Sequence, residues 1–333
     1  MNKEQTITGV IRGTGACVPE RILDNKEIAG FVDTSDEWIR ERTGVRRRRI
    51  AEKETTVSMA CEAGRQAVEE AGILPGEIDM ILVATGSPDQ IFPCTACQVQ
   101  EALGADGAVG FDLNAACSGF LFAYNTAQAY IASGIYRTVL VIGSESISRL
   151  VDWTDRGTCI LFGDGAGAVL LQAAEGRTYR PIAHSDGSGG AALTGPGVRN
   201  RIRSIDKDGR EAKTEYITMN GKDVFQFAVR KVPQVIQEVL KENKLSAKDI
   251  DWFVLHQANA RIVDAVARRL HIGIEKFPMN LQEYGNTSSA SVPILLNELN
   301  RNGLLKKGQK LVLAGFGAGL SWGADILEWD IKG

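Results

Sequence analysis

The sequence contains few cysteines, which excludes two kinds of protein. Six cysteines in 333 residues are too few for the disulfide framework that holds small secreted proteins together. Cys94 and Cys97 form the only CxxC motif, and no second pair of Cys or His residues lies nearby to complete a tetrahedral zinc site. The context IFPCTACQVQ favours the start of a helix over a redox-active turn. We therefore expect free cysteines with a structural role.

Long apolar runs and an excess of one charge are also absent. No segment approaches the roughly 20 apolar residues that span a bilayer, and the start, MNKEQTITGV, lacks the apolar region of a signal peptide. The formal net charge of -3 provides no global surface for nucleic acid or anionic membrane. The short run Arg46–Arg49 is interpreted as structural. These absences predict a cytoplasmic protein without a nucleic-acid or membrane partner.

The chain, 44% hydrophobic and with 36 glycines, is typical of a soluble α/β protein, and it contains an internal repeat. IDMILVAT at 78–85 matches IDWFVLHQ at 250–257, and VLVIG at 139–143 matches LVLAG at 311–315, both at an offset of 172. Apolar runs of this kind form buried parallel strands. Helical periodicity precedes the first strand of each copy, at 58–72 and at 225–243.

The repeat predicts two α/β halves, residues 1–175 and 176–333, which together form two sheets sandwiched by helices. The glycine-rich polar segment 184–215 is expected to be a long loop at the start of the second half. Two copies side by side would bring their strand ends to one shared central cleft.

The first candidate functional residue follows an apolar run of the first half. AVGFDLNAA at 108–116 leads to Cys117, and 118–134 has helical periodicity and ends at a glycine. The thiol is therefore expected at a helix N-terminus, where the helix dipole and unpaired amides stabilise a thiolate and can bind an oxyanion. Buried cysteines are more often inert packing, so position alone leaves both interpretations open.

Only three histidines could pair with such a thiol. His271 ends an arginine-rich helical segment, where a histidine is commonly a cap, and His184 lies at the edge of the glycine-rich loop. His256 instead ends the repeated strand at 250–257, where open α/β sheets place functional groups. A histidine in an apolar strand is usually a core residue, but the position at the strand end favours a function.

The counterpart of the Cys117 loop in the second half is YGNTSSAS at 284–291, because the repeat offset maps Cys117 onto position 289. Asn286 is thus within one turn of the equivalent position, although an asparagine before Thr-Ser can equally be a helix cap. GFGAGLSWGA at 315–324 follows the last repeated strand, and its small residues allow a close backbone approach that could supply an amide to an oxyanion hole. Loops at the strand ends of both halves thus converge on Cys, His and Asn.

Six ordered motifs reveal a resemblance over essentially the whole chain. The chain resembles the β-ketoacyl-acyl carrier protein synthase III family in VDTSDEWIRERTGVRRRRI, DLNAACSGF, TDRGTCILFGDGAGA, HQANARI, YGNTSSAS and GFGAGLSWG. The resemblance implies an internally duplicated, five-layered αβαβα thiolase fold, an α/β architecture, and usually a homodimer.

The resemblance also implies a reaction, a ping-pong Claisen condensation. Cys117 would take an acyl group from an acyl-CoA primer, and malonyl-acyl carrier protein would then enter. His256 and Asn286 would donate hydrogen bonds to the malonyl thioester oxygen and stabilise the enolate that forms as CO2 leaves. The backbone amides of Cys117 and Ala318 would form the oxyanion hole. No metal or redox cofactor is required.

The same resemblance implies roles in binding. Trp38 and Arg156 would flank the CoA adenine, and Arg42 would lie near its phosphates. The basic helix face of Arg261, Arg268 and Arg269 would receive the acidic carrier protein. Phe92 resembles the residue that reaches across the dimer to line the primer pocket. Each of these residues also has a structural alternative. Trp38 could be buried packing, the arginines could be solvated surface charges, and Phe92 could be a core or interface side chain.

Two departures from the family pattern are visible. Where relatives more often have three glycines, this chain has Gly317, Ala318 and Gly319, so the backbone donor is kept but a methyl group is added. Gln226 stands where relatives often carry a lysine for the carrier protein, and Lys222, one turn away, is a possible substitute.

Three alternative functions are compatible with parts of the sequence. A quinolone or polyketide starter enzyme of the same superfamily is the nearest. A cysteine hydrolase also uses Cys, His and Asn in this chain order, but the duplication and the missing Cys-Gly-Ser-Cys-Trp context oppose it. A binding protein without activity is disfavoured because all three catalytic residue types are present. Primer length and branching, and whether the extender is carrier-bound or CoA-bound, cannot be read from the sequence.

Overall fold

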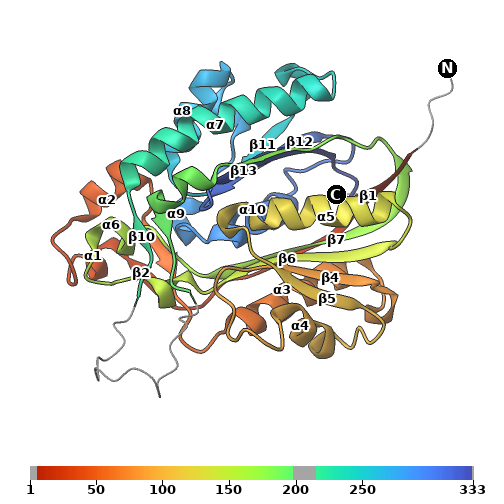
Figure 1. Cartoon of the computed structure of the whole chain (residues 1–333), viewed down its shortest axis with the longest axis horizontal. Coiled ribbons are helices and arrows are strands. Elements are labelled where there is room, and N and C mark those ends of the chain that lie inside the picture. The colour runs from red at the N-terminus through yellow and green to blue at the C-terminus, as the bar shows by residue number, and fades with distance from the viewer. Residues whose placement is uncertain (1–5, 198–214, 332–333) are drawn as a thin grey trace.

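The protein has five layers, in which two β-sheets alternate with three layers of helices (Figure 1). The structure is a computed structural model that describes residues 6–197 and 215–331. The predicted αβαβα thiolase architecture is confirmed. The loop expected at 184–215 lies partly outside the described residues. Its described part contains β9 (Leu193–Thr194), which pairs with β10 (Thr218–Met219) just after the segment.

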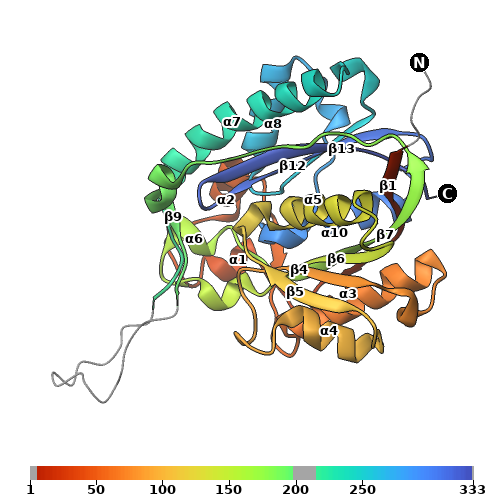
Figure 2. The same cartoon turned by 45° about the vertical axis from the view of Figure 1, so that its right-hand side comes forward.

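The first sheet belongs to the N-terminal part of the chain. Its strand order is β1 (Thr6–Cys17), β7 (Gly165–Gly176), β6 (Thr138–Glu145), β4 (Met80–Ala84) and β5 (Val109–Leu113). Strands β6, β4 and β5 are parallel, whereas β1 and β7 are antiparallel to their neighbours. Helices α3 (Thr56–Ala71) and α4 (Thr95–Leu103) cover its outer face (Figure 2).

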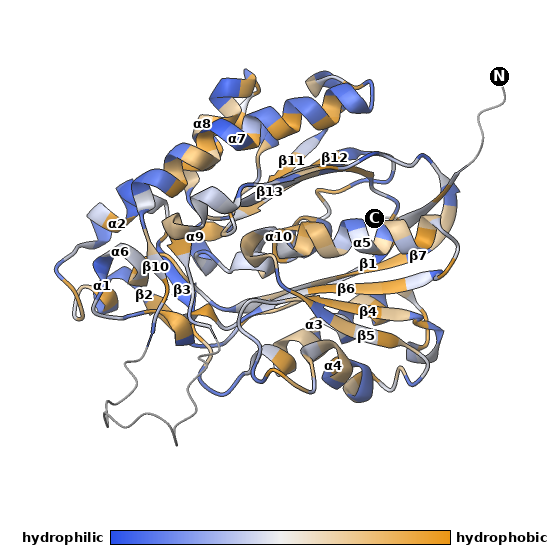
Figure 3. Ribbon diagram, in the orientation of Figure 1, coloured by the Kyte–Doolittle hydropathy of each residue, from blue (hydrophilic) through white to orange (hydrophobic). Residues whose placement is uncertain are grey.

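The second sheet repeats this arrangement with the C-terminal part of the chain. Its order is β11 (Trp252–Leu255), β12 (Lys310–Gly317), β13 (Ser321–Glu328) and β8 (Ile182–Ser185), covered outside by α7 (Gly221–Glu242) and α8 (Ala260–Leu270). Hydrophobic residues gather on the strands and on the helix faces turned toward them, whereas the outer faces of the helices are hydrophilic (Figure 3). Within the described residues, no helix is both long and apolar enough to cross a membrane.

The two sheets have the same register at the predicted offset. Met80 on β4 pairs with Val139 on β6, and Trp252 on β11 pairs with Leu311 on β12. Trp252 lies 172 residues after Met80, and Leu311 lies 172 residues after Val139, which is the offset of the sequence repeat. The helices predicted at 58–72 and 225–243 correspond to α3 and α7, which occupy equivalent outer layers. The two sheets thus share one strand pairing and one outer helix at the offset of the sequence repeat.

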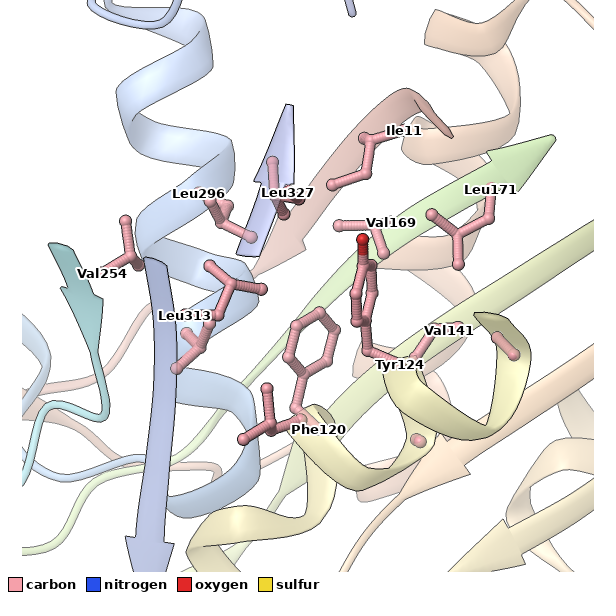
Figure 4. Close-up of a cluster of buried hydrophobic side chains, with 14 of the residues drawn as sticks. Ile11, Phe120, Tyr124, Val141, Val169, Leu171, Val254, Leu296, Leu313 and Leu327 are labelled. Atoms are coloured by element: carbon pink, nitrogen blue, oxygen red, sulfur yellow. The ribbon is translucent and has the colours of Figure 1, made fainter. Parts of the chain in front are cut away.

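The middle layer consists of α5 (Gly119–Ala132) and α10 (Ser291–Arg301), which lie between the sheets. Figure 4 shows Phe120 and Tyr124 on α5 among side chains of both sheets, such as Val169 on β7 and Leu313 on β12. All four side chains are buried. Because each large buried side chain contributes roughly 1.5–3 kcal/mol, this shared cluster is the core that holds the halves together.

Short elements gather at one end of the sandwich: β2 (Ile22–Asp24), α1 (Asn25–Ile28), α2 (Asp36–Thr43), β3 (Arg47–Arg49), α6 (Arg156–Cys159) and α9 (Leu281–Tyr284). Arg48 is fully buried among them, and its guanidinium donates hydrogen bonds to Asn25 Oδ1 (2.8 Å) and to the Ile160 carbonyl (2.6 Å). The structural interpretation of the arginine run is therefore correct for Arg48.

The turn before each middle helix packs against the sheet of the opposite half. A Cβ atom on Gly317, at the end of β12, would lie 2.7 Å from the Cβ of Cys117. A Cβ atom on Gly143 of β6 would lie 2.4 Å from the Ser289 carbonyl oxygen. Real Cβ atoms do not approach other atoms this closely, so both positions require glycine.

We predict that Gly143→Ala lowers the free energy of unfolding by about 1–3 kcal/mol or more, because a methyl group is forced against backbone that cannot rotate away. Denaturant unfolding measures this change. Gly76→Ala is the matched control, since a Cβ atom there meets nothing within 4 Å. Equal stability of the two variants would contradict the close packing of the halves.

Candidate active site

Cys117 lies in a tight turn between the first sheet and the middle layer. The 3-10 turn Ala116–Ser118 (η2) links β5 to α5, and Ala116 has a left-handed φ of 46°. The Ala116 amide donates to Asn114 Oδ1 at 3.1 Å, which supports the turn. A non-glycine residue in this conformation is strained, and such strain is concentrated at functional sites. The predicted position of Cys117 at the start of a helix is confirmed to within two residues.

The second half contains the same turn. Ser288–Ala290 (η7) precedes α10, and Ser288, the counterpart of Ala116 in the repeat, has a φ of 49°. The backbone of Asn286 is fixed just before this turn, donating to the Leu161 carbonyl at 2.8 Å. Its side-chain Oδ1 accepts from the Ser288 amide at 2.9 Å. Because Oδ1 is occupied, the Nδ2 hydrogens are the donors that this side chain can offer to a substrate.

His256 follows β11 and is held from two sides. Its amide donates to the Ala314 carbonyl (2.8 Å), and its Nδ1 lies 2.7 Å from Ser291 Oγ. Ser291 Oγ also accepts from the Gln257 amide (3.3 Å), and its own hydrogen is available to Nδ1. We therefore assign the imidazole hydrogen to Nε2, where it is a donor. Burial lowers the pKa of His256 to about 3, so the ring is neutral at physiological pH.

The last residues of β12 connect these groups. The ring of Phe316 meets the His256 imidazole edge to face at 5.1 Å between centroids. A Cβ atom on the next residue, Gly317, would lie 3.3 Å from Cys117 Sγ. His256 and Cys117 are therefore neighbours of consecutive residues on one strand. The turn η2 thus contacts both β12 and η7, so strand ends and turns of both halves meet at Cys117.

Burial opposes the thiolate expected at Cys117. The side chain is 9% exposed, and burial, aided by the negative charge of Glu145, raises the pKa of the thiol to about 12. Helix α5 begins only at Gly119, so the dipole of the helix does not outweigh the loss of hydration. Burial thus favours the protonated form of the Cys117 thiol.

Glu145 is a residue that the sequence reasoning missed. It ends β6, it is fully buried, and its carboxylate accepts hydrogen bonds from Ser87, Ser288 and Ser289. Burial raises the pKa of this carboxyl above its usual range. A comparison of positions 172 residues apart would have drawn attention to Glu145, because its counterpart is Gly317, which lies beside Cys117.

The residues expected to bind CoA lie together on the short elements at one end. Trp38 is on α2, and the guanidinium of Arg156, at the start of α6, lies 4.9 Å from the centroid of its indole ring. Arg42 lies 5.9 Å from the same ring. Flat groups stack about 3.5 Å apart, so a ring between Trp38 and Arg156 needs roughly 7 Å. Trp38 and Arg156 are in direct contact, so no space for an adenine ring remains between them.

The other predicted binding residues lie on exposed surfaces. Arg261, Arg268 and Arg269 are exposed on α8, although Arg269 also donates to the Val229 carbonyl at 2.7 Å. Phe92 is 82% exposed.

Two other groups of Cys and His residues have structural roles. His271 is the left-handed C-cap of α8, and His184 pairs with Glu238 at 2.7 Å. Cys94 is the N-cap of α4, as the helix-start interpretation predicted, and its sulfur lies 3.4 Å from that of Cys97. Among residues 6–197 and 215–331, no group of three or more His, Cys, Asp and Glu residues could hold a metal ion.

The fold and this set of side chains define a thiolase-fold condensing acyltransferase. Residues 111–190 match the family 3-Oxoacyl-[acyl-carrier-protein (ACP)] synthase III, and residues 240–329 match its C-terminal part. The chain belongs to the 3-oxoacyl-[acyl-carrier-protein] synthase III family, as the six motifs predicted. Because the chain belongs to this family, the alternative of a cysteine hydrolase is rejected.

Individual relatives match over nearly the whole chain. Beta-ketoacyl-[acyl-carrier-protein] synthase III of Clostridium acetobutylicum is 47% identical over 320 residues, which cover 96% of this chain and 98% of that protein. The crystal structure of 3-oxoacyl-[acyl-carrier-protein] synthase III from Aquifex aeolicus VF5 has a TM-score of 0.89 at 41% identity and covers 96% of this chain and 100% of that one. The priming beta-ketosynthase of the R1128 polyketide biosynthetic pathway has a TM-score of 0.92 at 35% identity, with 100% and 99% covered.

Proposed function

We propose that this enzyme condenses an acyl-CoA primer with malonyl-acyl carrier protein and so initiates fatty acid biosynthesis in the cytoplasm. The supporting observation is the meeting of two equivalent turns, one carrying Cys117 and the other preceded by Asn286, beside the strand ends of both sheets. The neutral, buried His256 adds a second fixed donor. The site thus combines a nucleophile with two neutral hydrogen-bond donors.

In the first half-reaction, Cys117 Sγ attacks the thioester carbonyl of the primer. The carbonyl becomes a tetrahedral oxyanion, which the amides of Cys117 and Ala318 stabilise. Collapse of this intermediate expels CoA, which leaves as a thiol with the proton that Cys117 gives up, and the acyl group stays on sulfur. A protonated resting thiol fits this stoichiometry, because the proton passes from one sulfur to the other.

In the second half-reaction, malonyl-acyl carrier protein enters and loses CO2. The electron pair of the broken carbon–carbon bond moves into the thioester, and the enolate oxygen is bound by His256 Nε2–H and Asn286 Nδ2–H. The enolate carbon then attacks the acyl group, and Cys117 leaves and takes up a proton. The product is 3-oxoacyl-acyl carrier protein. Neutral donors suit this step, because a charged imidazolium would protonate the enolate instead of only stabilising it.

Cys117→Ala should abolish the acyl-enzyme, because it removes the nucleophile. His256→Ala and Asn286→Ala should keep acylation but lower malonyl decarboxylation by about 100-fold or more, the usual effect of removing one oxyanion donor. Intact-protein mass after incubation with acyl-CoA measures acylation, and release of CO2 from malonyl-acyl carrier protein measures decarboxylation.

Two matched controls separate chemistry from folding. Cys159→Ala removes another buried thiol, and His184→Ala removes a histidine outside the site. Both should keep both half-reactions. An acyl adduct on the Cys117→Ala protein, or equal loss of both steps in the His256 and Asn286 variants, would overturn the assigned roles.

A polyketide or quinolone starter enzyme is the second candidate, favoured by the similarity to the R1128 priming beta-ketosynthase. The same mass measurement with a panel of acyl-CoA primers and carrier proteins distinguishes the two. Condensation with the carrier protein of fatty acid synthesis supports the first proposal, whereas transfer only to a polyketide carrier protein supports the second.

For the primer, we propose that CoA binds at Trp38, Arg42 and Arg156. The adenine would replace the Arg156 guanidinium on the indole ring, and the displaced arginine would close over its other face. Opening this contact also releases the hydrogen bond from Arg156 to the Asp33 carbonyl (2.8 Å). Arg261, Arg268 and Arg269 on α8 would receive the acidic carrier protein, with Lys222 near by in place of the missing lysine at Gln226.

Trp38→Ala should raise KM for acyl-CoA by roughly tenfold, since stacking on an aromatic side chain contributes about 1–3 kcal/mol per base. It should leave kcat nearly unchanged, because the ring would hold the adenine and not the reacting thioester. Steady-state kinetics over a range of acyl-CoA concentrations measures both. Arg40→Ala, on the same helix α2, is the control. A Trp38→Ala enzyme with wild-type KM would exclude this site.

We also propose that the enzyme is a homodimer formed through β5. This strand is the edge of the first sheet, and an edge presents unpaired N–H and C=O groups. Exposed apolar side chains accompany it: Val109 on the strand, and Ile91 and Phe92 on a nearby loop. Pairing with a second copy would cover them and place Phe92 at the partner's primer pocket.

Sedimentation equilibrium should therefore give about twice the chain mass of 36.0 kDa. Replacing Ile91 and Val109 by Asp should shift the mass toward that of one chain, because charge would be buried at the contact. The control is Leu74→Asp, an exposed apolar position away from β5. A wild-type protein that sediments as one chain would disprove the dimer.

A further inference from the structure

Cys94 and Cys97 form a close pair of thiols that the proposed function does not use. The thiol of Cys94 donates a hydrogen bond to the sulfur of Cys97, and the two sulfurs lie 3.4 Å apart. Cys97 is exposed and Cys94 is half-buried, so an external reagent has access to the pair. Among the described residues, the other four cysteines make no sulfur–sulfur hydrogen bond.

The first turn of α4, which carries both cysteines, is seated firmly on β5. The carboxylate of Asp112 on β5 accepts from the Thr95 amide (2.9 Å) and from the Ala96 amide (2.8 Å). A Cβ atom on Gly110, also on β5, would lie 3.1 Å from the carbonyl carbon of Ala96, so no side chain separates the strand from the turn. The backbone that bears the two sulfurs is therefore fixed.

Neither thiol is needed for the helix cap. Cys94 is the N-cap of α4, but its side chain makes no capping hydrogen bond. The thiol of Cys97 donates to the Gly110 carbonyl at 3.6 Å, and a thiol is a weak donor. From a separation of 3.4 Å the sulfurs need to approach by roughly 1.4 Å to reach the length of a disulfide bond, about 2.05 Å.

The charge beside the pair favours the reduced form. Asp112 occupies amides of the helix start that would otherwise stabilise a thiolate. The neighbouring Cys94 thiol raises the pKa of Cys97, and partial burial and the charge of Asp112 add to this shift. On its other sides α4 packs against apolar side chains of α3 and β4. Cys97 is therefore a slow nucleophile at neutral pH, because the thiolate is the form that attacks a disulfide.

We propose that Cys94 and Cys97 are a reversible dithiol–disulfide site, oxidised by a low-molecular-weight disulfide. The proposal adds a chemical role to the structural one that Cys94 has at the start of α4. It is independent of the proposed function, because no acyl substrate takes part. Disulfides of cytosolic proteins are usually transient and redox-sensing, which agrees with a pair that stays reduced until the oxidant accumulates.

The oxidation proceeds in two exchanges. The Cys97 thiolate attacks one sulfur of the oxidant, a mixed disulfide forms, and one thiol of the oxidant leaves. The Cys94 thiolate then attacks the Cys97 sulfur, the intramolecular disulfide forms, and the second thiol leaves. The protein loses two electrons and two protons, and the oxidant gains both as two thiols. A dithiol reductant reverses both exchanges.

The disulfide has no hydrogen to donate, so oxidation removes both S–H donors from the Gly110 carbonyl. This contact lies on β5, the edge strand of the first sheet. The exposed residues Ile91 and Phe92 come directly before the cysteine pair in the chain. The site thus links the oxidation state of two thiols to the edge strand and to the loop beside it.

The test is the oxidation of the full-length protein by glutathione disulfide, in the Cys117→Ala variant so that the nucleophile does not react. Free thiols are then alkylated with N-ethylmaleimide. Intact mass and non-reducing peptide mapping should show a Cys94–Cys97 disulfide, with the loss of two hydrogen atoms, and dithiothreitol should restore both thiols. In denaturant, at the same glutathione ratio, the ratio of disulfide to dithiol should be about tenfold lower, because the unfolded chain does not hold the sulfurs in contact.

Three variants serve as controls. Cys94→Ser and Cys97→Ser should each take up one glutathione and keep it, because no second thiol is present to expel it. Cys61→Ser removes a half-buried thiol on α3, and this variant should form the disulfide as the parent does.

The role of the charge is tested separately. Asp112→Asn should raise the rate of oxidation at neutral pH about threefold or more, because the loss of a negative charge increases the thiolate fraction of Cys97. Asp79→Asn is the matched control, since Asp79, just before β4, also accepts from two backbone amides, those of Arg137 (2.7 Å) and Thr138 (2.9 Å). Equal rates in the two variants would contradict the role assigned to Asp112.

The wild-type pair decides the inference in the Cys117→Ala protein. Thiols that both remain open to alkylation, a glutathione that stays on Cys97, or a bond from either sulfur to another cysteine would overturn it. A disulfide ratio that is equal in the folded and unfolded protein would show that the fold does not prearrange the pair, which also overturns it. Acylation of Cys117 is measured in a different experiment, so the failure of one proposal leaves the other intact.

Discussion

The close contact of each sheet with the turn of the opposite half is the constraint on which the rest of the structure depends. At Gly143 and Gly317 the strands run so near to the Ser289 and Cys117 turns that no side chain fits. Backbone held this tightly cannot adjust by small amounts, because packed interiors move between discrete arrangements and do not deform continuously. The positions of Cys117, His256 and Asn286 are therefore set by the packing of the halves.

Desolvation then determines the chemistry at this junction. Taken out of water, a thiol, an imidazole and a carboxyl all favour their neutral forms, and Cys117, His256 and Glu145 have pKa values shifted in that direction. Dipoles fixed in a dry site stabilise a developing charge far better than mobile water does. Under the proposed function, the protein thus provides prearranged neutral donors to the reacting thioester.

Much of this could be predicted from the sequence because a duplication provides its own alignment. Comparing segments at one constant offset located β4 with β11 and β6 with β12, and it placed Asn286 near the counterpart of Cys117. The protonation of Cys117 could not be predicted in this way, because helix position is visible in a sequence whereas the burial of one sulfur is a tertiary property. The closed contact of Trp38 with Arg156 depends likewise on two elements that are distant in the chain.

The two equivalent turns also imply a division of labour between once-identical parts. A protein built from two unchanged copies would carry the same residue at both turns, and hence two equal sites facing each other across the middle layer. In this chain one turn bears a thiol and the other a serine, with the amide of Asn286 just ahead of it. Under the proposed function the two copies are complementary, because each supplies a group that the other lacks. The symmetry survives in the backbone of the two turns, whereas their side chains differ.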